Sequence, residues 1–197
     1  MSACGPLPGT GVVPAPIPQG FPMDEVKVIA PDLRQNDDPG SLMLQKVELS
    51  PNRRLLFRYS GLRNHMSHVM TWDGKKIEVM IGVDTTQALP AQTEPLLLCP
   101  LNRNWMLRAT WSRAHPFGHQ GEWAKSGGDF DPAACIKVGR VDQNKLYFDV
   151  TTWFENGLKG LGKNFGFVLC STTPVTVLGN LSPNLPPRIE WVEQSRN

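Results

Sequence analysis

The chain has 197 residues, which fits one domain or one domain with an extended arm, because single hydrophobic cores usually stop growing beyond about 250 residues. Apolar residues make up 40% of the chain and charged residues 19%, and this balance excludes a highly charged disordered chain. The formal net charge of +2 offers too little positive charge for the counterion release that drives strong nucleic-acid binding. We therefore expect a folded domain that does not bind nucleic acid.

The hydropathy pattern predicts no membrane insertion. No stretch approaches the roughly 20 uninterrupted apolar residues with which a helix spans a bilayer, so we expect a soluble protein. Residues 1–23 contain neither Lys nor Arg, and Pro14, Pro16 and Pro18 interrupt their apolar residues. A Sec signal peptide needs a basic start followed by an apolar segment, so none is expected here.

The first 40 residues hold eight of the eighteen prolines, and their spacing favours an extended polyproline conformation. The predicted organisation is an extended Pro-rich N-terminal arm over residues 1–40 and a β-sandwich domain over residues 41–197. Apolar side chains of the arm, such as Val12 and Phe21, need a surface to cover them. We expect the arm to lie either across its own domain or on a neighbouring subunit of a homo-oligomer or larger assembly.

From residue 25 onward, short β-branched or alternating runs are separated by turn residues. Their spacing of roughly 8–12 residues is typical of a sandwich or barrel. The predicted strands are Glu25–Ala30, Leu42–Leu49, Arg54–Tyr59, His65–Thr71, Lys75–Val83, Leu96–Leu98, Trp105–Trp111, Ile136–Val141, Lys145–Val150, Phe165–Ser171, Val175–Leu178 and Arg188–Val192. The pattern predicts an all-β fold, an antiparallel sandwich of about ten strands.

Two turns and one helix are predicted between these strands. The Asp-Gly pair at 73–74 signals a hairpin because it accepts positive φ at both central turn positions, and the Asp-Gln-Asn segment at 142–144 predicts another. Thr152 and Glu155 have the spacing of a capping box, and Gly157 offers an early stop. A helix of one or two turns is therefore expected near these residues.

The four cysteines at positions 4, 99, 135 and 170 include no C-x-x-C pair, the spacing that would place two thiolates on one zinc ion. Cys99, Cys135 and Cys170 lie in apolar stretches, where a free cysteine behaves as a small hydrophobic residue. Buried free thiols are the expectation, and a single disulfide is the alternative.

The commonest catalytic motifs are absent from the sequence. It contains no G-x-G-x-x-G, P-loop, G-x-S-x-G or H-E-x-x-H pattern, so no enzyme is predicted. Asp129 and Asp131 follow a Gly-Gly turn, and two carboxylates at this spacing could supply oxygen ligands to Ca²⁺, the one cofactor considered. The alternative is that both Asp side chains cap turns.

Tryptophan and arginine gather in the segment between residues 103 and 125. Exposed Trp rings could stack on sugar rings, and Arg could meet the carboxylates of an acidic polysaccharide. The alternatives are core packing for the Trp rings and simple solvation for the charges. The candidate ligand-binding residues are Trp105, Arg108, Trp111, Arg113, His115, His119, Trp123 and Lys125.

Several short segments occur in an order that resembles the DNRLRE-type module. They are residues 54–59 (RLLFRY), 106–112 (MLRATWS), 121–131 (GEWAKSGGDFD), 147–157 (YFDVTTWFENG), 162–169 (GKNFGFVL) and 186–192 (PPRIEWV). The similarity covers about residues 42–193. It implies a jelly-roll β-sandwich that is not catalytic by itself and that is common in secreted or surface proteins, some of them carbohydrate-binding modules.

Two functions are predicted as alternatives. One is a non-catalytic surface or carbohydrate-binding β-sandwich module for acidic polysaccharide. The other is a structural assembly protein, such as a virion decoration, capsid or appendage subunit, that uses its N-terminal arm to bind neighbours. The expected location is extracellular or virion-associated, and the expected partner is a polysaccharide or a protein surface.

Overall fold

The computed structural model describes eight segments of the chain. They are residues 19–22, 25–33, 46–59, 76–86, 96–115, 121–158, 164–178 and 188–194. Several predictions lie outside the described residues, namely the hairpin at 73–74, the strand His65–Thr71, His119 and residues 1–18 of the arm.

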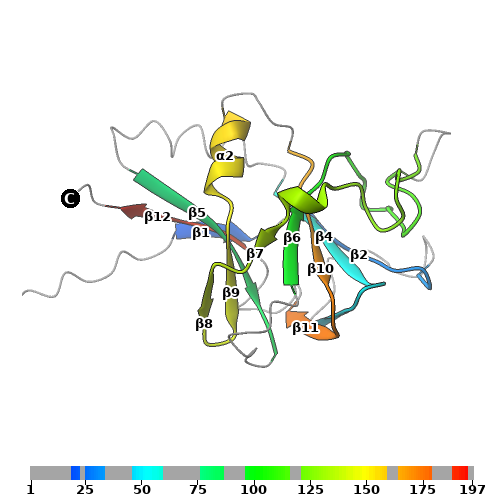
Figure 1. The fold of residues 1–197 in the computed structure, drawn as a ribbon, viewed down its shortest axis with the longest axis horizontal. Coiled ribbons are helices and arrows are strands. Elements are labelled where there is room, and N and C mark those ends of the chain that lie inside the picture. The colour runs from blue at the N-terminus through cyan, green and yellow to red at the C-terminus, as the bar shows by residue number, and fades with distance from the viewer. Residues whose placement is uncertain are drawn as a thin grey trace, which may run out of the picture.

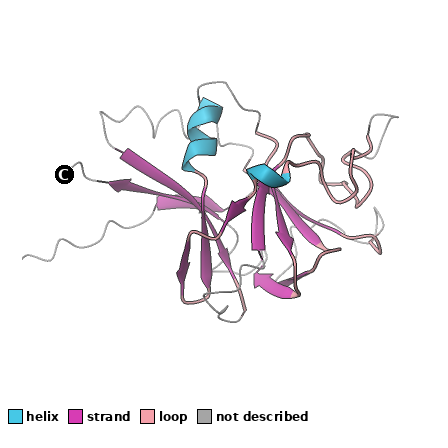
Figure 2. Ribbon diagram, in the orientation of Figure 1, coloured by secondary structure: helices cyan, strands magenta, loops and turns pink. Residues whose placement is uncertain are grey.

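Ten strands form two five-stranded antiparallel sheets (Figure 1). Sheet A contains, in spatial order, β1 (Gln19–Pro22), β12 (Arg188–Gln194), β5 (Lys76–Asp84), β9 (Lys145–Asp149) and β8 (Arg140–Asp142). Sheet B contains β2 (Glu25–Ile29), β4 (Arg54–Arg58), β10 (Phe167–Ser171), β6 (Leu96–Pro100) and β7 (Ile136–Lys137). A small third sheet pairs β3 (Lys46–Leu49) with β11 (Val175–Leu178). Figure 2 shows how far strands outweigh helices in the described chain.

The strand pairing is that of a jelly roll. β1 pairs with β12, β4 with β10, β5 with β9 and β6 with β7, so the pairs are nested around the connection between β6 and β7. Successive nested pairs alternate between sheet A and sheet B. A long hairpin rolled into two sheets in this way is a jelly roll. The predicted fold class, an all-β antiparallel jelly-roll-like sandwich, is confirmed.

Apolar side chains from both sheets fill the space between them. Along β5, the alternating residues Val79, Ile81 and Val83 are each 2% exposed or less, as period-2 burial requires. Opposite them, the rings of Phe57 and Phe167 on sheet B lie 6.2 Å apart between centroids. The alternating and apolar runs of the sequence also predict eight core residues. Seven of them are buried, namely Phe57, Val79, Ile81, Val150, Phe167, Val168 and Ile189, and the eighth, Trp153, is half-buried against the core.

The outer face of sheet B is also covered by protein. Leu56 and Val168 alternate with residues of the first core, so they point to the opposite face of the sheet. There they form a second buried cluster with Trp105 and Trp123 of the long connection between β6 and β7. This connection therefore folds back onto the sandwich as a third layer, and it carries the candidate site.

β1 and β2 lie within the residues predicted as the arm, and both belong to the sheets. β1 pairs with β12 at the edge of sheet A, and β2 pairs with β4 at the edge of sheet B. Val26 and Val28 are 1% and 4% exposed, because they help to fill the core. β2 is the strand predicted at Glu25–Ala30, so the sheets begin within the residues assigned to the arm.

The predicted strand at Trp105–Trp111 is wrong. This segment consists of turns, with the amide of Ala109 donating to the carbonyl of Met106 at 2.8 Å. Trp105 and Ala109 are buried while the three residues between them are exposed. Such a burial pattern has no period of two, which is what a strand on a sheet surface requires.

The helix lies where it was predicted, but its cap differs. α2 (Thr151–Leu158) begins one residue before Thr152, which is exposed inside the first turn. The amide of Thr151 donates to Oδ1 of Asp149 at 2.9 Å, so an Asp carboxylate caps the helix. The predicted turn at 142–144 is confirmed, since β8 and β9 pair up to Asp142 and Lys145.

Two of the three cysteines expected as free thiols form a disulfide. Leu98 of β6 pairs with Ile136 of β7 in an antiparallel ladder. The next residue on one side is Cys99 and the preceding residue on the other is Cys135. This register brings the two cysteines opposite each other. Only Cys170 is free among the described cysteines, and it is half-buried.

Candidate functional site

The candidate site lies in the connection between β6 and β7, and we call its described residues 101–115 and 121–131 the loop end. Its two ends run together, because Leu101 bridges Phe130 and the amide of Asn102 donates to the carbonyl of Asp129 at 2.8 Å. Further out, Arg113 bridges Glu122. The loop end is thus an irregular hairpin whose shape is set by backbone hydrogen bonds.

The indole rings of Trp105 and Trp123 belong to the interior of this layer. Trp105 is 1% exposed, and its Nε1 donates to the carbonyl of Phe165 at 2.8 Å. Trp123 is 6% exposed, and its Nε1 donates to the carbonyl of Thr110 at 2.9 Å. Because the rings are covered and their polar atoms are satisfied, the structure does not present them for stacking on a sugar.

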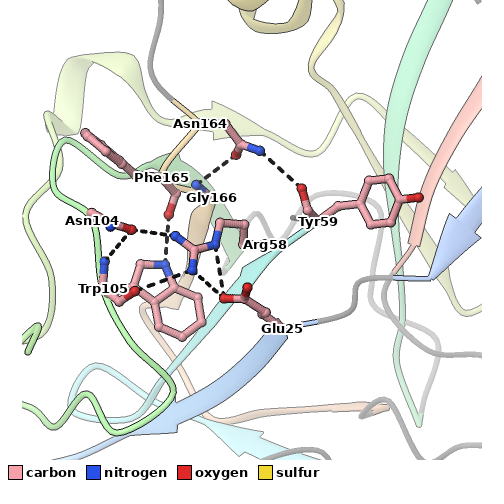
Figure 3. A network of polar contacts seen from close by, with 8 residues as sticks. All are labelled: Glu25, Arg58, Tyr59, Asn104, Trp105, Asn164, Phe165 and Gly166. Atoms are coloured by element: carbon pink, nitrogen blue, oxygen red, sulfur yellow. Dashed lines mark hydrogen bonds and ion pairs between the residues drawn. The ribbon is translucent and has the colours of Figure 1, made fainter. Parts of the chain in front are cut away.

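Arg58 of β4 fastens the first turn of the loop end to sheet B (Figure 3). One Nη of Arg58 lies 2.5 Å from Oε2 of Glu25 on β2, and the other donates to Oδ1 of Asn104 at 2.5 Å. Its guanidinium carbon lies 5.2 Å from the ring centroid of Trp105, within the range of a cation–π contact. Three segments distant in sequence therefore meet at one side chain.

Arg54, at the other end of β4, fastens the far part of the loop end. Its guanidinium carbon lies 4.9 Å from the ring centroid of Trp111 and 5.4 Å from that of Phe130. Nη1 of Arg54 donates to the carbonyl of Gly127 at 2.8 Å. The amide of Gly127 in turn donates to the carbonyl of Trp111 at 2.6 Å. The half-buried ring of Trp111 thus has an intramolecular partner.

An open pocket of about 450 Å³ lies beside this anchor. Its lining residues are Asn102, Arg103, Ala124, Lys125, Asp129 and Phe130. Arg103 donates through Nη1 to the carbonyl of Glu122 and lies 3.6 Å from Oδ2 of Asp129. The backbone amide of Lys125 donates to Oδ1 of Asp129 at 2.9 Å, and its side chain is exposed. Both cationic side chains therefore border the same cavity.

The remaining predicted site residues are spread over the loop end. Arg108 is exposed at a tip beside Met106 and Leu107, whose side chains are 50% and 38% exposed. Arg113 and His115 are half-buried along the hairpin. Among the described residues predicted to bind a sugar, only Lys125 lines the pocket, together with Arg103 from the start of the same segment.

The two predicted calcium ligands have structural partners. Asp129 accepts from the backbone of Lys125, and Asp131 accepts from the amide of Ala133 at 2.9 Å as the cap of a short 3-10 helix, η2 (Pro132–Ala134). Both are thus used as turn caps, the alternative considered for them. Within the described segments, no group of three or more His, Cys, Asp or Glu is arranged to hold a metal ion.

The pocket residues that the sequence analysis missed are Asn102, Ala124 and Phe130, and the anchors that it missed are Arg54 and Arg58. Arg54 and Arg58 flank the apolar middle of β4, which reads as an ordinary strand with charged ends. Their hydrogen-bond partners in the loop end lie 46 to 73 residues away in sequence. No local pattern signals such pairs.

Among the titratable groups of the described residues, Asp84 and Cys170 have a displaced pKa, and neither lies at the pocket. Burial raises the pKa of Asp84, which is 5% exposed in sheet A, against the lowering effect of the Lys145 ammonium. Burial also raises the pKa of the Cys170 thiol to about 11. At neutral pH this thiol is protonated, and the thiol form is a poor nucleophile.

No protein-family model matches the chain, and no curated protein matches it. The resemblance to DNRLRE-type modules thus stays a hypothesis that rests on the segments quoted above. In the described part of the chain, no helix has the length and apolar character needed to cross a membrane.

We predict that Gly127→Ala destabilises the loop end. Gly127 has φ of +90°, and a Cβ there would lie 2.7 Å from Nη1 of Arg54 and 2.8 Å from Cη2 of Trp111. A left-handed backbone alone costs about 1–2 kcal/mol for a residue with a Cβ. Urea unfolding should show at least this loss of free energy. Gly139→Ala is the matched control, because the nearest atom to its added Cβ is 3.7 Å away, and it should change little. Equal effects of the two variants would contradict the role given to Gly127.

Proposed function

We propose that this chain is a non-catalytic binding module that holds acidic polysaccharide in the pocket at the loop end. The single observation that carries the proposal is the open cavity of about 450 Å³ bordered by two cationic side chains, Arg103 and Lys125. Loops carried on a rigid β-sandwich are where such binding sites commonly lie.

The lining residues supply the chemistry that an acidic sugar needs. The exposed ammonium of Lys125 can meet a uronate carboxylate, and the side chain of Asn102 can exchange hydrogen bonds with hydroxyl groups. Phe130 contributes apolar surface to the same wall, which suits the C–H face of a sugar ring. In this proposal Phe130 takes the part that the sequence had suggested for the tryptophans.

The pocket is held in shape before any ligand arrives. Asp129 is tied by its carbonyl to the amide of Asn102 and by its carboxylate to the amide of Lys125. Arg103 is held between the carbonyl of Glu122 and the carboxylate of Asp129. Preorganised walls reduce the entropy cost of binding. This preorganisation supports a binding role for the pocket, because only a few of its side chains can make polar contacts with a sugar.

We predict that Lys125→Gln weakens binding of polygalacturonate oligosaccharides about tenfold at low salt. The substitution removes one ionic contact, and charge-assisted hydrogen bonds are stronger than neutral ones. Isothermal titration calorimetry at several salt concentrations measures the effect, and affinity of the wild type should fall as salt rises. Arg140→Gln on β8 is the matched control, since it removes the same charge from the far sheet, and it should bind like the wild type.

Two results would contradict the proposed site. One is wild-type affinity in Lys125→Gln, and the other is equal loss in Lys125→Gln and Arg140→Gln, which would indicate attraction by net charge alone. Absence of binding to any acidic glycan would favour the second candidate function.

That second candidate is a structural assembly subunit that binds its neighbours through its N-terminal arm. β1 is the outermost strand of sheet A, and no strand pairs with its outer edge among the described residues. Such an edge can pair with another chain. β1 follows directly on the Pro-rich residues 1–18.

The assembly function predicts an oligomer that depends on the arm. Size-exclusion chromatography with light scattering should give a multiple of 21.9 kDa for the full chain and a monomer after deletion of residues 1–18. A monomer in both cases would argue against this function.

A further inference from the structure

The disulfide between Cys99 and Cys135 lies at the base of the proposed pocket. On one side of it, Leu98 pairs with Ile136 in the β6–β7 ladder. On the other side, Leu101 bridges Phe130, and Asn102 hydrogen-bonds to Asp129 in the pocket wall. The disulfide therefore connects the sandwich to the place where the two walls of the pocket come together.

The two walls are held to the sandwich very differently. The wall that begins at Leu101 continues from β6, which pairs with β10 over five residues, from Leu96 to Pro100. The wall that ends at Asp131 continues into β7, which has only two residues and pairs with β6 alone. Beyond Phe130, which contacts Arg54 and bridges Leu101, the second wall is connected to the sandwich by this short strand and the disulfide.

The two cysteines differ in exposure as well. Cys99 is 1% exposed, whereas Cys135 is half-buried directly after η2. A thiolate from outside therefore reaches Cys135 and displaces Cys99, because exchange proceeds at the accessible sulfur. Cys170 is a poor internal attacker, since burial keeps its thiol protonated.

We propose that the Cys99–Cys135 disulfide is a redox switch for the pocket, an inference that rests on the proposed function. A dithiol reductant attacks Sγ of Cys135, forming a mixed disulfide and releasing Cys99 as a thiolate that takes up a proton. The second thiol of the reductant then closes its own disulfide and releases Cys135, so two electrons and two protons pass to the protein. The two walls of the pocket keep their relative positions while the disulfide is present, and they become mobile when it is reduced.

Loosening is local, because Arg54 still holds the carbonyl of Gly127 after reduction. The part that gains freedom is the wall from Asp129 to Cys135, which carries the acceptor of the Asn102 amide. The affinity for an acidic glycan falls because the walls must then be ordered during binding.

The test compares the oxidised chain, the chain reduced with dithiothreitol, and the double variant Cys99→Ser with Cys135→Ser. Cys170→Ser is the control that keeps the disulfide and removes the thiol of Cys170. Two readouts are taken: binding of polygalacturonate oligosaccharides by calorimetry, and amide hydrogen exchange. We expect at least tenfold weaker binding and at least tenfold faster exchange of the Asn102 amide on reduction. The amide of Val150, which donates to Val79 in the core, should not change.

Hydrogen exchange decides the inference even if no glycan binds. Unchanged exchange of the Asn102 amide after reduction would overturn it, and so would equal acceleration at Val150, which would make the bond a general support of the fold. Lack of binding by the oxidised chain would refute the proposed function alone. Tight binding that survives reduction would refute the switch alone.

Discussion

The guanidinium of Arg54 is the interaction on which the third layer of this protein depends. It contacts the rings of Trp111 and Phe130 and donates to the carbonyl of Gly127, so three points of the loop end meet at one side chain of sheet B. Cation–π contacts of this kind contribute about 0.5–2 kcal/mol each, more when desolvated. Nε of Arg54 is buried without a hydrogen-bond partner among the described residues, so part of this gain is offset.

The geometry of β4 explains how two arginines hold the loop end against sheet B. Arg54, Leu56 and Arg58 alternate along the strand and so share its outer face. Leu56 belongs to the second buried cluster, while the arginines at either side of it contact Trp111 and Trp105. The period of the strand thus spaces two cationic anchors on either side of one apolar contact.

The pocket follows from this attachment. Because the anchored tryptophans are buried or engaged, the loop end presents Lys125, Asn102 and Phe130 instead of indole rings. A surface with one free ammonium group and a small apolar wall is suited to modest, salt-dependent recognition of a carboxylate-bearing sugar. The nearby disulfide gives the same surface a covalent support on its weakly paired side.

The alternation of apolar and polar residues was enough to predict most strands. Every second residue of such a strand faces the core and is apolar, as Val79, Ile81 and Val83 are. Alternation gave a wrong strand at Trp105–Trp111, because these residues are apolar for packing within the loop end and not for facing a core from a strand. The Cys99–Cys135 bond and the Arg54 anchor join residues distant in sequence, and only the register of the folded sheets brings them together. For the same reason Phe130 and Asn102 could not be assigned to a pocket in advance.

Amide hydrogen exchange in Arg54→Leu tests most directly whether Arg54 holds the loop end against sheet B. Arg53→Leu is the control, because it removes the charge of the neighbouring residue. If Arg54 fastens the loop end, the amide of Gly127, which donates to Trp111, should exchange at least tenfold faster in Arg54→Leu. The control should leave it unchanged, and the amide of Val168 in β10 should stay protected in both variants. Unchanged protection of Gly127 in Arg54→Leu would contradict the account, because the third layer would then be held without this side chain.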